Sequence, residues 1–279
     1  MKYENPSIPE GINYSNNHPL QDLFLMLLVF VGCIIISIVM LFTLTAHLAK
    51  NIPFSTELAL AESLTFSASD DGERYPELQH YLQQLAEQLA RTEQLPDDMS
   101  IYIHYVNDAT VNAFASLGGQ IYIHCGLLEK LPNENALSMV LAHEIAHIKH
   151  RDPIVAAGRG LSILLALGSM LGIGDNSMSE QLIAHVSNIT ALAYNRNQEL
   201  EADNEAIQSL LRRYGHLSGS VALFQILQLQ KEVPLEPPEF FSTHPLTESR
   251  LERLSALAQS SPGGVTPLPP NLMTSINCE

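Results

Sequence analysis

The sequence predicts an α+β fold that is mostly α-helical, with a small β-sheet and one transmembrane helix ahead of the domain. An uncharged apolar run covers residues 23–48, and several later segments repeat apolar residues at helical spacing. Two short runs, 101–106 and 120–125, alternate in the manner of strands. A chain of 279 residues has room for one sizeable domain and an appendage.

The composition excludes one class of partner. The chain has 14 basic and 30 acidic residues and a net charge of −16. Nucleic-acid binding is therefore not expected, because phosphate contacts need clustered Lys and Arg. The three cysteines, Cys33, Cys125 and Cys278, form neither a disulfide framework nor a zinc knuckle by their spacing. They do not settle the redox compartment.

A polar N-terminal tail, 1–22, precedes the apolar run. The 26 residues from Leu23 to Leu48 carry no charge and are long enough to cross a hydrocarbon layer of about 30 Å. A cleaved secretory signal has a shorter apolar core. A lipoprotein cleavage site before Cys33 is an alternative, but the apolar run continues beyond it. We interpret residues 23–49 as an uncleaved single-pass anchor rather than a buried core helix.

The sequence indicates only weakly which end of this anchor lies inside the cell. Lys2 lies before the span, and His47 and Lys50 follow it closely. The positive-inside rule counts nearby basic residues, and here they are nearly balanced. We expect a bacterial inner-membrane protein with its N-terminus inside and its large domain outside, in the periplasm of a Gram-negative bacterium.

Residues 50–74 are expected to form a linker, and Pro76 to open an amphipathic helix. The leucines of its apolar face recur at helical spacing: Leu78, Leu82, Leu85 and Leu89. The two strand-like runs follow, separated by a Leu117–Gly119 turn. His104 and His124 fall on these strands, and we interpret them as structural or surface residues.

The chemistry centres on an H-E-x-x-H motif, His143 to His147, in a segment of helical spacing that Asn133 could cap. Side chains four apart on a helix lie about 40° from each other, so both imidazoles can grip one metal ion. Imidazole suits zinc, and a neighbouring carboxylate can act as general base; Glu144 is that candidate. The pattern also occurs by chance. A third metal ligand elsewhere in the chain would favour a zinc site over a chance occurrence of the motif.

Acidic residues on a downstream helix provide that candidate ligand. Glu199 and Asp203 are four apart and share a helix face, so Glu199 can bind metal while Asp203 supports a ligand histidine. Glu201 points about 160° away from Glu199 and should be solvated. The alternative is an ordinary acidic surface helix. His150 lies one turn beyond His147; it could reach the metal, although we expect it to end the helix before Pro153.

The apolar segment Ile154–Gly174 resembles a second span. A single crossing there would put Glu199 on the wrong side of the membrane from His147, and the compensating segment 182–193 is short and polar. We therefore expect Ile154–Gly174 to form a buried or membrane-grazing helix.

These motifs resemble the HtpX-like and CAAX-prenyl-endopeptidase-like zinc metallopeptidases over roughly Tyr75 to Leu257. Asn195 replaces the usual Ser, and Leu246 stands where a second Pro is common. Four stretches carry the resemblance: Asn112–Ala115 with Gly118–Tyr122 and Gly126–Leu128; His143–His147; Arg196 with Glu199–Asp203; and Ser242–Leu251.

The resemblance implies a gluzincin-type metallopeptidase domain over 75–258. It implies one zinc ion per chain, held by His143, His147 and Glu199, with Glu144 as base. It also implies that the strand Gln120–His124 is a sheet edge that binds substrate in extended form. The residues expected along this substrate edge are Asn112, Gln120 and Tyr122.

Four further expectations follow from the resemblance and the composition. His244 is a fourth ligand or an oxyanion stabiliser, or else part of a helix-capping His-Pro turn. Arg250 pairs with a carboxylate near the site, such as Asp203. The Pro-rich 231–238 could form a flap over the site, and the Pro- and Ser-rich tail 259–279 should be disordered.

The leading functional hypothesis is a membrane-anchored zinc endopeptidase that hydrolyses misfolded or membrane-associated proteins, in contact with the lipid bilayer. The alternative is a chaperone-like module that binds unfolded segments, with a latent or structural zinc site. A prenyl protease is disfavoured, because such enzymes enclose their site among many spans. The intact Glu144 favours the peptidase.

Overall fold

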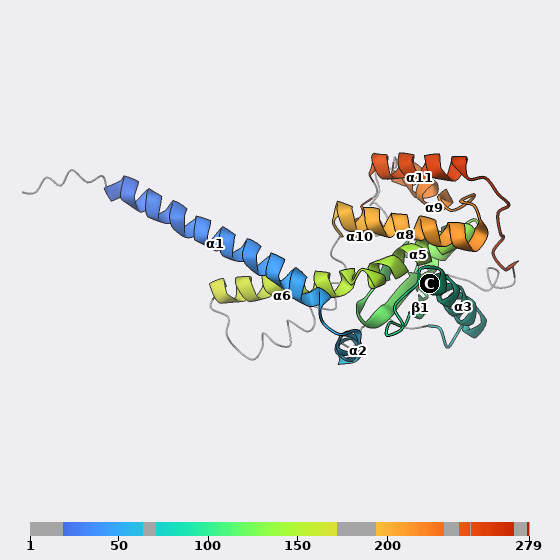
Figure 1. Cartoon of the computed structure of the whole chain (residues 1–279), viewed down its shortest axis with the longest axis horizontal. Coiled ribbons are helices and arrows are strands. Elements are labelled where there is room, and N and C mark those ends of the chain that lie inside the picture. Colours follow the sequence, from blue (N-terminus) through green and yellow to red (C-terminus); the bar gives the residue numbers. More distant parts are fainter. Residues whose placement is uncertain are drawn as a thin grey trace, which may run out of the picture. The chain divides into compact units, whose positions relative to one another are not determined.

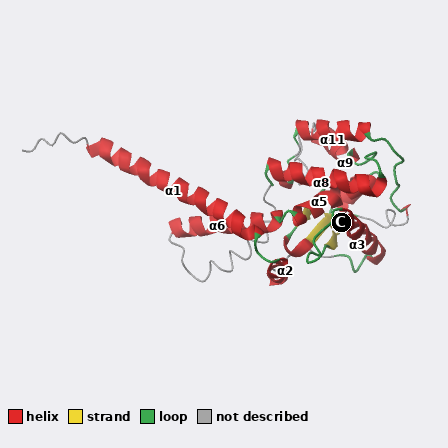
Figure 2. Ribbon diagram, in the orientation of Figure 1, coloured by secondary structure: helices red, strands yellow, loops and turns green. Residues whose placement is uncertain are grey.

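The computed structural model describes residues 19–63, 71–171, 194–231, 240–245, 247–270 and 278. Within these residues the chain is mostly helical and has a three-stranded sheet, as predicted (Figures 1 and 2). The chain divides into two compact units, 1–43 and 44–279, and each is described by itself.

The first unit consists of most of α1 (Pro19–Lys50). Within the described chain, α1 is the helix that is long and apolar enough to cross a bilayer. Large apolar side chains along it, such as Phe24 and Phe30, are 67% and 63% exposed. The predicted helix 23–49 is confirmed, whereas residues 1–18 of the predicted tail lie outside the described residues.

The second unit holds the sheet and most of the other helices (Figure 1). Its helices are α2 (Phe54–Ser63), α3 (Pro76–Thr92), α4 (Cys125–Lys130), α5 (Glu134–Lys149), α6 (Asp152–Leu171), α8 (Arg196–Tyr214), α9 (Ala222–Lys231), α10 (Phe240–Thr243) and α11 (Glu248–Ser260). The amphipathic helix begins at Pro76 and buries all four predicted leucines. The predicted flap falls almost wholly on 232–239, outside the described residues.

The predicted linker 50–74 is not a bare connection, because it contains α2. Phe54 and Glu57 on this helix are only 4% and 3% exposed. The sequence of α2 has no clear apolar stripe, and Glu57 is of a type seldom buried without a partner. The partners of α2 lie far away in the chain, so local periodicity could not reveal this helix.

Helix α6 occupies most of the predicted segment Ile154–Gly174. Its residues 154–157 are buried, which agrees with the expectation of a buried helix at its start. The alternative crossing segment 182–193 lies outside the described residues.

The sheet consists of β1 (Tyr102–Val106), β2 (Ala113–Ala115) and β3 (Gln120–His124), in the order β1-β3-β2. β1 runs parallel to β3, and β2 runs antiparallel to it. The prediction that 120–124 is an edge is therefore wrong, because β3 is paired on both sides. The edge strand beside α5 is β2. Its three residues, Ala-Phe-Ala, are too few to be predicted as a strand from the sequence.

One face of the sheet packs on α3 and α5. The side chains of this face belong to the same core as both helices: Ile103, Tyr105, Ala113, Ala115, Ile121 and Ile123. On the other face, Tyr122 stacks between His104 and Phe114, with ring centroids 4.8 Å and 5.1 Å apart. His104 is thus a structural residue of this aromatic row, as expected.

The predicted Leu117–Gly119 turn is present as a short 3₁₀ helix. Gly118 and Gly119 have φ values of 68° and 76°, in the left-handed region that favours glycine. A Cβ atom on Gly119 would collide with the carbonyl oxygen of Ser100. The turn therefore requires glycine for both conformation and space.

The C-terminal tail is not disordered where the structure describes it. We call residues 261–270 the C-terminal strap. Its Thr266 accepts a hydrogen bond from Glu134 N at 2.9 Å and donates one to Asn135 Oδ1 at 2.8 Å. Composition predicted disorder, but the first turn of α5 has unsatisfied N–H groups that an extended segment can bind.

A disulfide joins Cys125 to Cys278 across 153 residues of sequence. The cysteine spacing indicated no disulfide framework, and it did not predict this single bond. Spacing says nothing about two cysteines that only the tertiary fold brings together. Cys33 is free and exposed.

We expect Cys278→Ala to lower the melting temperature of the domain. Loss of a disulfide that closes a long loop costs about 2–4 kcal/mol, which corresponds to a fall of roughly 5–15 °C. Thermal unfolding with and without reductant measures this, and Cys33→Ala is the matched control. An unchanged melting temperature of the parent in reductant would contradict the disulfide.

Candidate metal centre

The two motif histidines lie on the buried helix α5. Asn133 caps this helix as predicted, and its side chain accepts a hydrogen bond from Ala136 N at 2.8 Å. His143 and His147 are 1% and 0% exposed, and their Nε2 atoms lie 3.1 Å apart. One turn of helix therefore brings both ring nitrogens to one point.

Glu199 reaches the same point from α8, which packs against α5. Asn195 caps α8 through a reciprocal capping box with Gln198, so asparagine fills the place of the usual serine. The Glu199 carboxylate lies 3.4 Å from His143 Nε2 and 3.6 Å from His147 Nε2. The predicted third ligand candidate is thus within reach of both histidines.

His244 follows α10 and completes the group. Its Nδ1 lies 3.0 Å from Glu199 Oε1 and 3.3 Å from His143 Nε2. Thr247, and not His244, caps α11 by accepting from Arg250 N. His244 is 1% exposed and belongs to the cluster.

The donor set fits a zinc ion. One ligand atom from each of four buried side chains lies within 4.8 Å of the others; the four are His143, His147, Glu199 and His244. Imidazole and carboxylate are the donors that zinc takes in hydrolase sites.

The surroundings of the two motif histidines also favour a positive charge. Nδ1 of His143 lies 3.2 Å from Asp203 Oδ1, and Nδ1 of His147 lies 2.8 Å from Asp152 Oδ2. A carboxylate that faces Nδ1 favours the histidine tautomer with its proton on Nδ1. The two Nε2 atoms then face each other at 3.1 Å, and a proton or a metal ion between them would relieve the repulsion of their lone pairs.

The pKa values agree with this need for positive charge. Burial lowers the pKa of His143, but the Asp203 and Glu199 carboxylates outweigh burial and raise it to about 10. Burial raises the pKa of Glu199, but the charge of His244 and the hydrogen bonds of the histidines outweigh burial and lower it. The cluster thus stabilises a positive charge at the position where zinc would lie.

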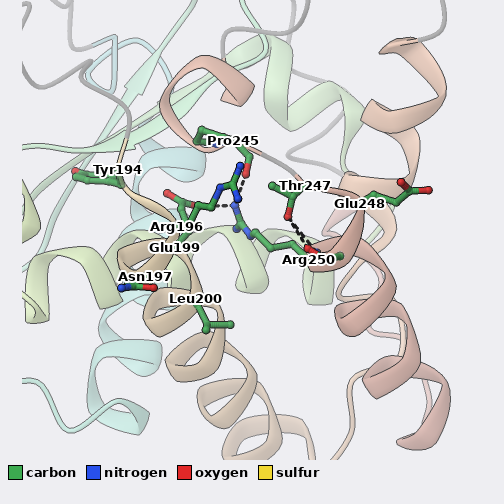
Figure 3. Close-up of a pocket in the computed structure, with 10 residues that line it drawn as sticks. Tyr194, Arg196, Asn197, Glu199, Leu200, Pro245, Thr247, Glu248 and Arg250 are labelled. Atoms are coloured by element: carbon green, nitrogen blue, oxygen red, sulfur yellow. Dashed lines mark hydrogen bonds and ion pairs between the residues drawn. The ribbon is translucent and has the colours of Figure 1, made fainter.

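Arg250 holds two carboxylates of the site, as the sequence suggested for Asp203. Its Nε and Nη2 donate to Asp203 at 2.8 Å each, and Nη1 lies 2.5 Å from Glu199 Oε2. Nη1 also donates to Pro245 O at 3.0 Å (Figure 3). These residues lie beside a pocket of about 550 Å³ between the start of α8 and the start of α11.

Asp152 belongs to the site, although its sequence context predicts only a helix end. It accepts from His147 on one oxygen, and Gln198 Nε2 donates to the other at 2.6 Å. Burial raises the pKa of Asp152, but the hydrogen bond with His147 outweighs it and lowers the pKa. No spacing rule connects Asp152 with Gln198, so the sequence carries no signal for this pair.

Tyr194 is a second residue that the sequence pattern does not single out. Its ring stacks on that of His147, with centroids 4.0 Å apart and planes at 24°. Tyr194 directly precedes the capping box of α8, where an aromatic residue has no distinctive meaning. The stacking fixes the plane of one ligand candidate.

Glu144 lies fully buried beside the cluster. Its Oε2 accepts a hydrogen bond from Ala115 N on β2 at 2.7 Å, and its Oε1 lies 3.2 Å from His244 Nε2. Burial raises the pKa of Glu144, against the opposing effects of the histidines and of the Ala115 N–H. The carboxylate is therefore fixed on one side and directed at the cluster on the other.

The remaining candidates lie farther out. His150 ends α5 and is not part of the cluster, and Glu201 is exposed, both as expected. Gln120 and Tyr122 lie on the central strand β3 rather than on an edge. Asn112 lies directly before the edge strand β2 and accepts a backbone hydrogen bond from His124.

Comparison with known proteins decides the family. Residues 76–258 match Peptidase family M48. The chain belongs to this family. The helix α5 with the H-E-x-x-H motif and the helix α8 with Glu199 both lie within the matched residues.

Three relatives show how far the likeness extends. The chain is 33% identical over 162 residues to the beta-barrel assembly-enhancing protease of Yersinia pestis, covering 54% of this chain and 33% of the relative. It is 32% identical over 158 residues to that of Escherichia coli, covering 52% and 32%. It is 30% identical over 215 residues to a protease HtpX homolog of Sulfurovum, covering 63% and 75%. The chain thus spans about a third of the length of the first two.

We expect Asp152→Asn to weaken zinc binding by about 10–100-fold, because the His147 ring loses the carboxylate that orients it. Competition with a chromogenic chelator measures the affinity. Glu201→Gln, an exposed acid on α8, is the control and should bind zinc like the parent. Equal affinities of the Asp152→Asn variant and the parent would contradict this role.

Proposed function

We propose that this M48 protein is a membrane-anchored zinc endopeptidase. The observation that carries the proposal is the position of Glu144 beside the cluster. Its carboxylate is fixed by the Ala115 N–H and lies fully buried, with its other oxygen directed at the cluster. A site that holds zinc only for structure has no need of a base at this position.

The mechanism follows from these contacts. His143, His147 and Glu199 would hold zinc, which would supply Lewis acidity towards the scissile carbonyl and the attacking water. Glu144 accepts a proton from this water and later returns it to the leaving amine. Asp152 keeps the His147 ring in the orientation that directs its Nε2 at the site.

The substrate backbone would pair with β2 rather than with β3. Ala115 N–H points away from β3, towards Glu144. Because backbone groups alternate along a strand, the N–H and C=O of Ala113 point to the same side. Ala113 and Ala115 are 0% exposed, so a peptide would reach this edge only after the residues that cover it move. An extended peptide bound there would lie next to the base and be recognised mainly by its backbone, which suits sequence-tolerant cleavage. Asn112, at the start of this edge, remains a candidate contact.

The membrane location rests on α1, which is long and apolar enough to span a bilayer. An anchor and a signal sequence both have this property. We favour the anchor because the apolar helix far exceeds the usual core of a signal, about 7–15 residues. The Cys125–Cys278 disulfide supports a domain on the oxidising side of the membrane, which in a Gram-negative bacterium is the periplasm.

The substrates proposed are unfolded or membrane-associated proteins, as in protein quality control. An edge strand that binds a substrate through backbone hydrogen bonds accepts only an extended segment. Folded proteins rarely expose such a segment. The anchor would hold the site close to the bilayer. The name of the Yersinia relative, an assembly-enhancing protease, is in keeping with such substrates.

We expect Glu144→Gln in the full chain, in detergent and loaded with zinc, to cut labelled casein about 10²–10⁴-fold more slowly than the parent. The glutamine cannot accept the proton but keeps the shape of the side chain, so one zinc per chain should remain bound. Zinc is counted in both proteins. Equal rates in the two proteins would sink the peptidase proposal.

A second candidate, a latent state, is favoured by one observation. His244 lies within ligand distance of the cluster through Nδ1 and contacts Glu144 Oε1 through Nε2. With zinc bound, His244 in this arrangement would compete with the attacking water for the metal, and it also contacts the base. A chaperone-like module with a closed zinc site would have this geometry.

If this geometry is latent, His244→Ala should raise the rate of casein cleavage by roughly tenfold, the effect of removing about 1.4 kcal/mol of competition for the site. Initial rates of the parent and the variant test this. His150→Ala, outside the cluster, is the control. A loss of about 10²–10³-fold would instead assign His244 to oxyanion stabilisation.

A further inference from the structure

We propose that Glu57 on α2 is a positioning residue for both the base and a histidine of the metal centre, a role that rests on the proposed peptidase function. α2 precedes the M48 match at 76–258. Yet the Glu57 side chain is 3% exposed and faces two segments that lead directly into the site.

The first segment is the glycine turn behind the base. Gly118 N donates to Glu57 Oε1 at 2.9 Å. Three residues earlier, Ala115 N donates to Glu144. A Cβ atom on Gly118 would lie 2.9 Å from Ala61 Cβ, so α2 rests directly against this turn. The end of the strand that fixes the base is therefore itself fixed by α2.

The second segment directly follows α5, the helix that carries His143 and His147. Arg151 Nη2 lies 2.9 Å from Glu57 Oε2 and donates to Ile52 O at 2.6 Å. Arg151 has φ 63° and is 8% exposed. It directly precedes Asp152, the partner of His147 Nδ1. Glu57 thus holds the side chain of the residue that directly precedes the orienting carboxylate.

One carboxylate therefore joins the two halves of the catalytic arrangement. One oxygen binds the turn that leads to the base, and the other binds the arginine beside the residue that orients His147. Ile52 belongs to the short connection between α1 and α2. The membrane-proximal connection is in this way tied to the metal centre, and not only to the surface of the domain.

The test compares Glu57→Ala with the parent in the full chain, in detergent, loaded with zinc and supplied with labelled casein. We expect kcat to fall about 10–100-fold while KM stays within about twofold and one zinc per chain remains bound. Glu57→Gln should recover part of kcat, because its amide oxygen still accepts from Gly118 N. Glu62→Ala, an exposed acid on the same helix, is the matched control.

Amide hydrogen exchange gives a readout that does not depend on cleavage. Glu57→Ala should speed exchange at Ala115 and Gly118 relative to Glu62→Ala. If the parent does not cleave casein but this exchange responds, the peptidase proposal fails and the positioning role stands. If kcat and exchange both match the control, the positioning role is overturned. If Glu57→Ala does not fold, kcat and amide exchange are measured on Glu57→Gln instead. Values of both that equal those of the parent would overturn the positioning role of Glu57.

Discussion

The balance of buried charge at the metal centre is the constraint on which the rest of the domain depends. Glu144, Asp152, Glu199 and Asp203 are each no more than 1% exposed. Burying carboxylates together is unfavourable unless cations and hydrogen bonds compensate. Arg250 supplies one positive charge, and the convergent histidine nitrogens provide the place for a second, which zinc would fill. The burial of these carboxylates where α5 packs against α8 depends on this compensation.

The same balance explains why so many chain segments meet at one point. Each group that faces the zinc position is fixed by a residue from another element: His147 by Asp152, Glu199 by Arg250, and Glu144 by the N–H of a β2 residue. A small sheet is enough to fix the base, because the edge strand β2 provides the one backbone N–H that binds Glu144.

Helix α5 is held at both of its ends by segments outside the M48 match. At its start, the C-terminal strap bonds to Glu134 and Asn135. At its end, Arg151 bonds to Glu57 and to the connection before α2. The Cys125–Cys278 disulfide adds a covalent link between the chain after β3 and the C-terminal end. Segments outside the matched residues 76–258 therefore brace the helix that carries the motif.

The sequence by itself determined the elements whose signals are local. The apolar run of α1, the leucine stripe of α3, the Asn133 cap and the pair His143 and His147 follow from helical periodicity, capping chemistry and residue spacing. Glu199 could also be predicted, because one helical turn to Asp203 and the family resemblance pointed to it.

The tertiary structure decided everything that joins distant segments. It placed β3 in the centre of the sheet, ordered the Pro- and Ser-rich strap, paired Cys125 with Cys278 and brought Asp152 to Gln198. It also buried Glu57 within a stretch that looked like a linker. The physical reason is common to all of these. Strand order, disulfide pairing and burial of a charge depend on partners far away in the chain, and a local pattern does not identify those partners.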